Sequence, residues 1–163
     1  MRPLFLLLST VSLYACASLQ SNDPNSLGFS LPEGSTASLN KPLNIPGGYT
    51  HTVIQFGKET NDQNKQDYEI NCRVDFRKFG PRTIDPEKFI ITRTEDGTNW
   101  VSRPSIMRFY TEIHLSSQQS TDIIKIVCQQ YGDVIDRNFT VAEMQAGLGD
   151  IIRFEYGDKS KSE

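Results

Sequence analysis

Two stretches of regular alternation limit what this chain of 163 residues can fold into more than any other feature. In residues 68–76 and again in residues 106–115, mainly apolar side chains take every second position, and polar side chains take most of the positions between them. Because successive side chains of a β-strand point to opposite faces, each stretch predicts a strand with one buried and one solvated face. The buried-face positions are Tyr68, Ile70, Cys72, Val74 and Phe76 in the first strand and Met107, Phe109, Thr111, Ile113 and Leu115 in the second.

Other short segments have strand-like composition, and one of them has apolar residues on both faces. It carries Ile124, Ile126 and Cys128 on one face and Ile123 and Val127 on the other, which predicts a central strand. A polar segment, residues 58–67, predicts an exposed loop. The further predicted strands are residues 49–57, 89–94, 122–131 and 150–156.

The dipeptide Asp96-Gly97 predicts a tight turn. Asp-Gly between two strand-like segments is typical of a two-residue hairpin, in which both central residues need positive φ. In this interpretation Trp100 and Val101 begin the returning strand. Pro104 ends that strand, because proline cannot donate a hydrogen bond to a sheet.

One helix is expected, at residues 139–148. Thr140 and Glu143 have the spacing of a capping box, in which each side chain accepts a hydrogen bond from the backbone amide of the other residue. Phe139 and Met144 stand at the two positions of the hydrophobic staple. Many strands, frequent turns and one short helix predict a mainly β fold: a small antiparallel β-sandwich or barrel.

The first residues of the chain have the features of a secretory signal. Arg2 gives a positive start, and residues 4–13 form an apolar run that is too short for a membrane-spanning helix of about 20 residues. The run ends in Leu13-Tyr14-Ala15-Cys16. This resembles the lipobox of bacterial lipoproteins, although Tyr14 stands where that family usually has a small residue.

The resemblance covers the leader alone and implies that Cys16 is lipidated and becomes the mature N-terminus. Each methylene group that an acyl chain buries in the membrane contributes ~0.8 kcal/mol, so several acyl chains would hold the protein on a membrane almost permanently. Ala17, directly after the cysteine, does not resemble an inner-membrane retention signal. The implied location is therefore the outer membrane, with the folded domain facing the periplasm.

An ordinary secretory cleavage is the alternative. Ala15-Cys16-Ala17 also fits the small-x-small rule, and cleavage there would remove Cys16 and release a soluble periplasmic protein. The short apolar run and the position of the cysteine directly at its end favour lipidation.

Two cysteines remain for the folded part, Cys72 and Cys128, and each lies on the apolar face of its predicted strand. In an oxidising compartment an even pair predicts a disulfide bond. Such a bond across a long loop is worth up to about 4 kcal/mol in the chain-entropy model.

Composition divides the chain into four parts. Residues 1–15 are the signal peptide and residues 16–48, rich in Ser, Asn, Pro and Gly, predict a lipidated cysteine followed by a flexible tether. Such a tether has a reach of roughly 30 Å. Residues 49–156 are the β-rich domain, and residues 157–163 a polar tail. The alternative for the tether is that residues 39–45 pack along the domain.

Charge and motifs exclude several functions. Removal of residues 1–15 takes away Arg2 and no acid, so the formal net charge of −3 becomes −4, which argues against nucleic-acid binding. His51 and His114 are the only histidines, and no metal site, cofactor site or phosphate-binding loop is predicted. With no catalytic motif, we expect no enzyme activity.

The best candidate interaction surface is one face of the strand at residues 106–115. Arg108, Tyr110, Glu112 and His114 alternate along it and so project from one side. Tyrosine and arginine are enriched at protein interfaces. The alternatives are an ordinary solvated sheet face, or a buried face beneath a second sheet.

These observations leave two functional hypotheses. The first is a non-catalytic envelope lipoprotein, attached to the membrane through its N-terminal lipid, whose β-domain binds another envelope protein as an adaptor or in envelope assembly. The second is an envelope enzyme or a small-ligand-binding barrel. A filled core would favour the first, and a concave site of several hundred Å³ with convergent polar groups would favour the second.

Overall fold

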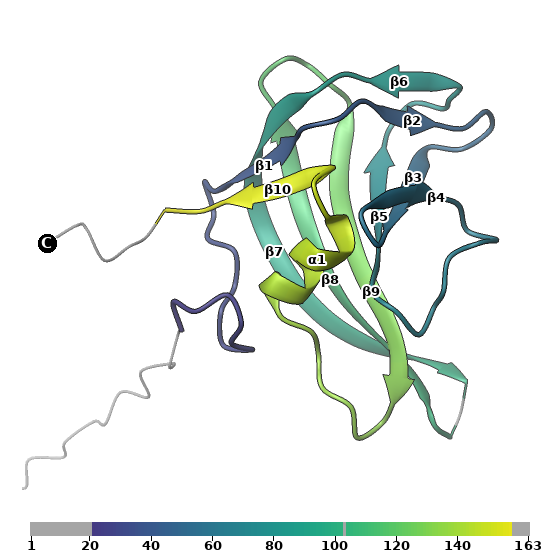
Figure 1. Ribbon diagram of the computed structural model, residues 1–163, viewed down its shortest axis with the longest axis vertical. Helices are drawn as coiled ribbons and strands as arrows, with labels where there is room; N and C mark the ends of the chain where they lie inside the picture. The colour runs from purple at the N-terminus through teal and green to yellow at the C-terminus, as the bar shows by residue number, and fades with distance from the viewer. Residues whose placement is uncertain (1–20, 103, 158–163) are drawn as a thin grey trace, which may run out of the picture.

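The computed structural model describes residues 21–102 and 104–157. An antiparallel sheet of eight strands curls into a half-barrel around one short helix, α1, with a two-stranded sheet at one end (Figure 1). This confirms the predicted mainly β, antiparallel fold with a single short helix. The strands are Thr36–Leu39 (β1), Leu43–Ile45 (β2), His51–Gln55 (β3), Lys58–Thr60 (β4), Asn71–Phe76 (β5), Arg82–Ile84 (β6), Glu87–Ser102 (β7), Ile106–Ser117 (β8), Ile123–Asp133 (β9) and Ile152–Glu155 (β10); the helix is Val141–Leu148 (α1).

The large sheet has the strand order β10-β1-β7-β8-β9-β5-β3-β4, and β2 pairs with β6 in the small sheet. The three long strands β7, β8 and β9 lie side by side in its middle (Figure 1). The predicted central strand, β9, is flanked by β8 and β5 as expected. Its register shifts near Phe76, and as a result Ile123 is buried whereas Ile124 is exposed.

The concave face of the sheet holds the hydrophobic core. Helix α1 lies inside the curl (Figure 1), and its buried side chains Met144 and Leu148 belong to the same core cluster as Ile113 on β8 and Ile126 on β9. The amide of Ala142 donates to the carbonyl oxygen of Pro24 at 3.0 Å, so the N-terminal segment lies against the helix.

The helix begins as its sequence predicts. Thr140 is the N-cap, its Oγ1 accepts from the Glu143 amide at 3.2 Å, and the Glu143 carboxylate accepts from the Thr140 amide at 2.7 Å. Phe139 and Met144 are both buried, in keeping with the staple. The helix ends at Gly149, the C-cap, whose φ of 58° lies in the left-handed region that glycine adopts readily.

The predicted disulfide is present. Cys72 on β5 and Cys128 on β9 are directly paired in the sheet, both are fully buried in the concave core, and they are bonded to each other. The bond therefore joins two neighbouring strands in the middle of the core.

The predicted tether is wrong for residues 36–45. β1 pairs with β7 and β10 inside the large sheet, and β2 pairs with β6. Leu39, Leu43 and Ile45 are buried, so the alternative that residues 39–45 pack along the domain is correct. The prolines of this region do not prevent it, because Pro42 and Pro46 lie just outside β2. The folded domain thus begins well before residue 49.

The predicted turn at Asp96-Gly97 is also wrong. β7 continues through both residues to Ser102, and the hairpin turns between Ser102 and Ile106. Gly97 has no positive φ; instead, a Cβ at this position would lie 2.4 Å from Cζ of Tyr110, its partner on β8. Glycine is present here because the tyrosine ring lies against the backbone, and not because the chain reverses.

The segment predicted as an exposed loop, residues 58–67, begins with a strand, since β4 pairs with β3 at the sheet edge. The predictions for the signal peptide, for Cys16, for residues 17–20 and for the tail after Gly157 lie outside the described residues. Among the residues that are described, no helix has the length and apolar character needed to cross a membrane.

Candidate functional site

The convex face of the sheet carries the four residues of the predicted surface. Arg108, Tyr110, Glu112 and His114 project from β8 away from the core, each of them half-buried. Their cross-strand partners divide them into two groups, so the row is not one site. Arg108 and Tyr110 belong to a tyrosine–arginine cluster, and Glu112 and His114 belong to a charged cluster.

The tyrosine–arginine cluster consists of Arg108, Tyr110 and Gln129. The Arg108 guanidinium lies 4.6 Å from the centre of the Tyr110 ring, and its Nε donates to Gln129 Oε1 at 2.6 Å. Tyr110 also packs against the backbone of Gly97. All three side chains are therefore held by contacts within the domain.

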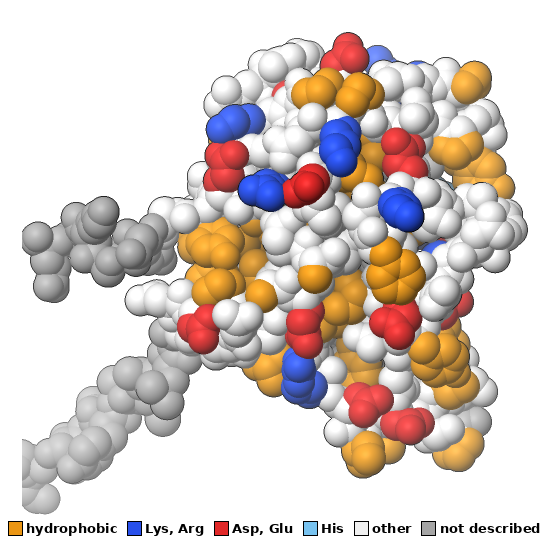
Figure 2. Space-filling model, viewed as in Figure 1, with side chains coloured by type: hydrophobic (Ala, Val, Ile, Leu, Met, Phe, Trp, Pro, Cys, Tyr) orange, Lys and Arg blue, Asp and Glu red, His pale blue; other side chains and the backbone are white. Residues whose placement is uncertain are grey.

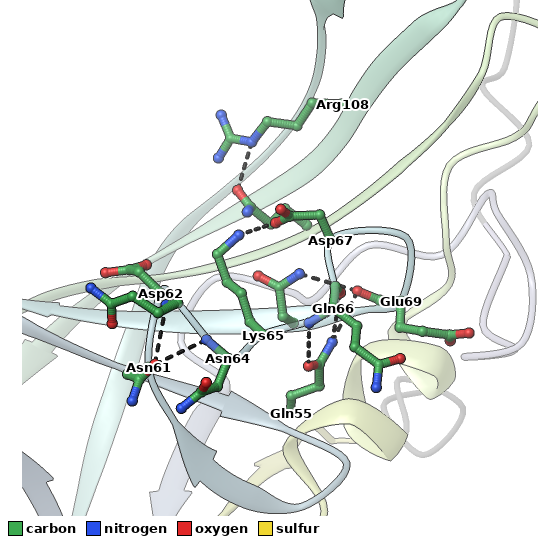
Figure 3. Close-up of polar contacts among 12 residues, drawn as sticks. Gln55, Asn61, Asp62, Asn64, Lys65, Gln66, Asp67, Glu69 and Arg108 are labelled. Atoms are coloured by element: carbon green, nitrogen blue, oxygen red, sulfur yellow. Dashed lines mark hydrogen bonds and ion pairs between the residues drawn. The ribbon is translucent and has the colours of Figure 1, made fainter.

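A folded loop, residues 61–70, connects β4 to β5 and folds around the side chain of Gln55 (Figure 3). The buried side chain of Gln55 donates to the carbonyl oxygens of Gln66 and Glu69 at 2.9 and 3.3 Å and accepts from the Gln66 amide at 2.9 Å. The Asn61 side chain accepts from the Asn64 amide at 3.0 Å. The sheet thus fixes the path of a loop that the sequence predicts to be merely exposed.

The charged cluster consists of Arg93, Glu95, Glu112, His114 and Lys125. Lys125 Nζ lies 2.7 Å from Glu112 Oε2, and His114 Nε2 lies 3.5 Å from the same oxygen. Partial burial raises the pKa of Glu112, but the hydrogen bond and charge of Lys125, together with nearby positive charge, outweigh it and leave the pKa below its ordinary value. Glu112 is thus held as a carboxylate.

Sequence reasoning missed an apolar end of the half-barrel. Trp100 and Val101, at the end of β7, are 47% and 45% exposed, and Val134 and Ile135, just after β9, are 52% and 90% exposed. Both segments lie at one end, since Ile106, at the start of β8, is paired with Asp133 at the end of β9. Figure 2 shows hydrophobic side chains at this lower end. Both apolar pairs are visible in the sequence. The turn predicted at Asp96-Gly97, however, placed Trp100 and Val101 at the start of a strand and not at its end.

Two hollows lie beside helix α1 on the concave side. One of 310 Å³ is lined by Phe56 and Ile70, one of 260 Å³ by Phe109 and Arg137, and both contain Gln130 and Glu143. Ligand sites are typically about 300–1,000 Å³. The main acidic group shared by the hollows, Glu143, already accepts from Arg137 and from the helix N-cap.

The described histidines do not form a nucleophilic site. His51 pairs with Asp62 at 2.7 Å, and His114 lies among Arg93, Glu95 and Glu112. In the described part of the chain, neither ring is hydrogen-bonded to a hydroxyl or thiol side chain that it could activate. A comparison of the chain with family models, curated proteins and solved structures found no match.

Proposed function

We propose that this protein is an outer-membrane lipoprotein whose periplasmic half-barrel binds another envelope protein without catalysis. The observation that carries the proposal is the apolar end: Trp100 and Val101 on one side of β8, and Val134 and Ile135 on its other side, are all exposed at the same end of the half-barrel. Exposed apolar groups gathered at one place are typical of interaction sites, and tryptophan is strongly enriched among the residues that dominate binding. The lipobox-like leader and the buried disulfide support the envelope location.

The charges beside the apolar end favour a protein over an anionic lipid surface. Asp133 and Asp136 flank Val134 and Ile135 and are exposed, and the charge of the next residue, Arg137, is paired with Glu143. Anionic headgroups attract basic segments, so this acidic border opposes contact with them. The partner that fits is a protein surface with apolar residues bordered by Lys or Arg.

Photo-crosslinking in living cells tests the binding site. A photo-reactive residue at Trp100 or Ile135 should trap one discrete partner protein. The same residue at Phe79 is the matched control, because Phe79 is 68% exposed but lies at the opposite end of β9, where the amides of Arg77 and Lys78 donate to Asp122. Crosslinks that are equal at all three positions, or none at Trp100 and Ile135, would contradict the proposal.

Labelling with radioactive palmitate tests the anchor separately. Wild-type protein should incorporate the label and Cys16→Ser should not, because the acyl chains are attached at that cysteine. An unlabelled wild-type protein that begins after Cys16 would show secretory cleavage instead.

The two hollows beside α1 favour one second candidate, a small-ligand binder. Native mass spectrometry of the protein purified from cells would reveal a retained small molecule. Its loss on Ala146→Trp, which fills the larger hollow, together with failed crosslinking at the apolar end, would replace the adaptor by a ligand carrier.

A further inference from the structure

We propose that Glu95, Glu112 and His114 form a binding site for Zn²⁺ on the convex face. Glu95 and Glu112 are directly paired across β7 and β8, and His114 follows Glu112 on the same face of β8. The candidate ligand atoms of the three side chains all lie within 4.8 Å of one another. The site is independent of the apolar end and of the proposed partner.

The distances suit a single ion. Ligand atoms about 2 Å from one tetrahedral zinc ion lie roughly 3.3 Å apart. His114 Nε2 is 3.5 Å from Glu112 Oε2 and 4.0 Å from Glu95 Oε2. The longer gap closes with a small movement of Glu95, whose side chain is half exposed.

The chemistry of the three groups selects the metal. An imidazole and two carboxylates suit a borderline divalent ion, and three protein ligands leave a fourth position for water or for a partner's side chain. Mg²⁺ prefers an octahedral set of oxygens, so it should compete weakly. Two carboxylates directly opposite one another in a sheet repel, so this pair needs nearby positive charge, which a divalent ion supplies at a single point.

Two side chains now occupy the positions that the metal would use. Lys125 Nζ lies 2.7 Å from Glu112 Oε2, and Arg93 approaches Glu95 and His114 at 3.1 Å each. Both are long, and Arg93 is more than half exposed, so it can turn into solvent. Zinc must displace these cations, and this gives the site a signature that an ordinary ion-pair network lacks.

Zinc titration of the full chain, purified as cells produce it, tests the site. The wild type should bind one Zn²⁺ and melt at a higher temperature with the metal. His114→Ala and Glu95→Gln should each weaken binding at least about tenfold, the loss that follows even from removal of a group that only orients a ligand. His51→Ala is the matched control, because His51 pairs with a single carboxylate elsewhere, and it should bind as the wild type does.

Arg93→Ala supplies the second readout. Removal of the competing cation should tighten zinc binding several-fold, whereas a purely structural network would show no change in affinity. Melting without metal identifies any variant that fails to fold, and Arg93, at an exposed position, is the least disruptive of the set. Absence of zinc binding by the wild type, equal losses in His51→Ala and His114→Ala, or weaker binding by Arg93→Ala would each overturn the proposal.

Discussion

The two faces of the same sheet are stabilised in different ways. On the concave side, apolar residues of β5, β8 and β9 pack under α1 around the Cys72–Cys128 bond. On the convex side of the described structure, only Val53 and Val127 are buried apolar residues outside that core, and Arg73 lies between them in the sheet. The concave face therefore supplies most of the buried apolar packing of the fold, whereas the convex face adds hydrogen bonds and ion pairs.

Loss of the disulfide should have the largest effect, because it lies in the centre of the concave face. Replacing Cys72 and Cys128 together by alanine should lower the free energy of unfolding by about 4 kcal/mol. The melting temperature should fall by roughly 10 °C, as a thermal scan would show. Two reactive thiols in the folded wild-type protein would contradict the expectation.

A matched pair of valines compares the faces directly. Val74 faces the concave core and Val127 the convex side, and both are buried. Val74→Ala should cost about 2.5 kcal/mol, because the packed core cannot close the cavity. Val127→Ala should cost about 1 kcal/mol, because the stems of its cross-strand neighbours Arg73 and Glu112 can move over the gap. Equal losses in denaturant unfolding would mean that the convex face is packed as rigidly as the core.

Gly97 tests how tightly the convex face is packed at Tyr110. Gly97→Ala should cost about 2 kcal/mol, because the new methyl group would meet the tyrosine ring. Combining it with Tyr110→Ala should cost less than the sum of the two single changes, since the clash disappears. The control is Gly157→Ala, where a Cβ meets nothing, and no change in stability is expected. A neutral Gly97→Ala would show that the ring moves freely.

Features encoded by local pattern were predictable from the sequence. The alternation on β5 and β8, the cap formed by Thr140 and Glu143 and the pairing of two core-facing cysteines need only a few neighbouring residues or a shared parity. β1 and β2 were not predictable because they are short, four and three residues, and lie among prolines and glycines typical of loops. Their strand structure depends on partners far along the chain.

The candidate sites depend on register, which the sequence does not reveal. Asp96-Gly97 has the composition of a turn, but the reason for Gly97 is tertiary, the ring of Tyr110. A two-residue turn at Asp96-Gly97 would have paired Glu95 with Thr98, the first residue after the turn. Because the chain turns beyond Ser102 instead, Glu95 lies opposite Glu112, and Trp100 lies at the end of the half-barrel.

The smallest effect is expected at the open border of the concave face, where Glu143 lines both hollows. The hydrogen bond from Arg137 lowers the pKa of Glu143 to about 2, and the bonds from Thr140 add to this effect. Because the folded pKa lies below the ordinary value of 4.5, the stabilisation is complete above about pH 4.5 and is lost as the pH falls towards 2. The side chain is 40% exposed, so the stabilisation is modest.

Two variants separate the ion pair from the cap. Glu143→Gln keeps a side chain that can complete the capping box but removes the charge, so it should cost under about 1 kcal/mol at neutral pH. It should also lose less stability than the wild type between about pH 4.5 and pH 2. Thr140→Ala keeps the ion pair and removes the cap, so it should cost about 1 kcal/mol across the pH range. Urea unfolding at a series of pH values measures both, and identical acid dependence in wild type and Glu143→Gln would mean that solvent screens the Arg137 pair completely.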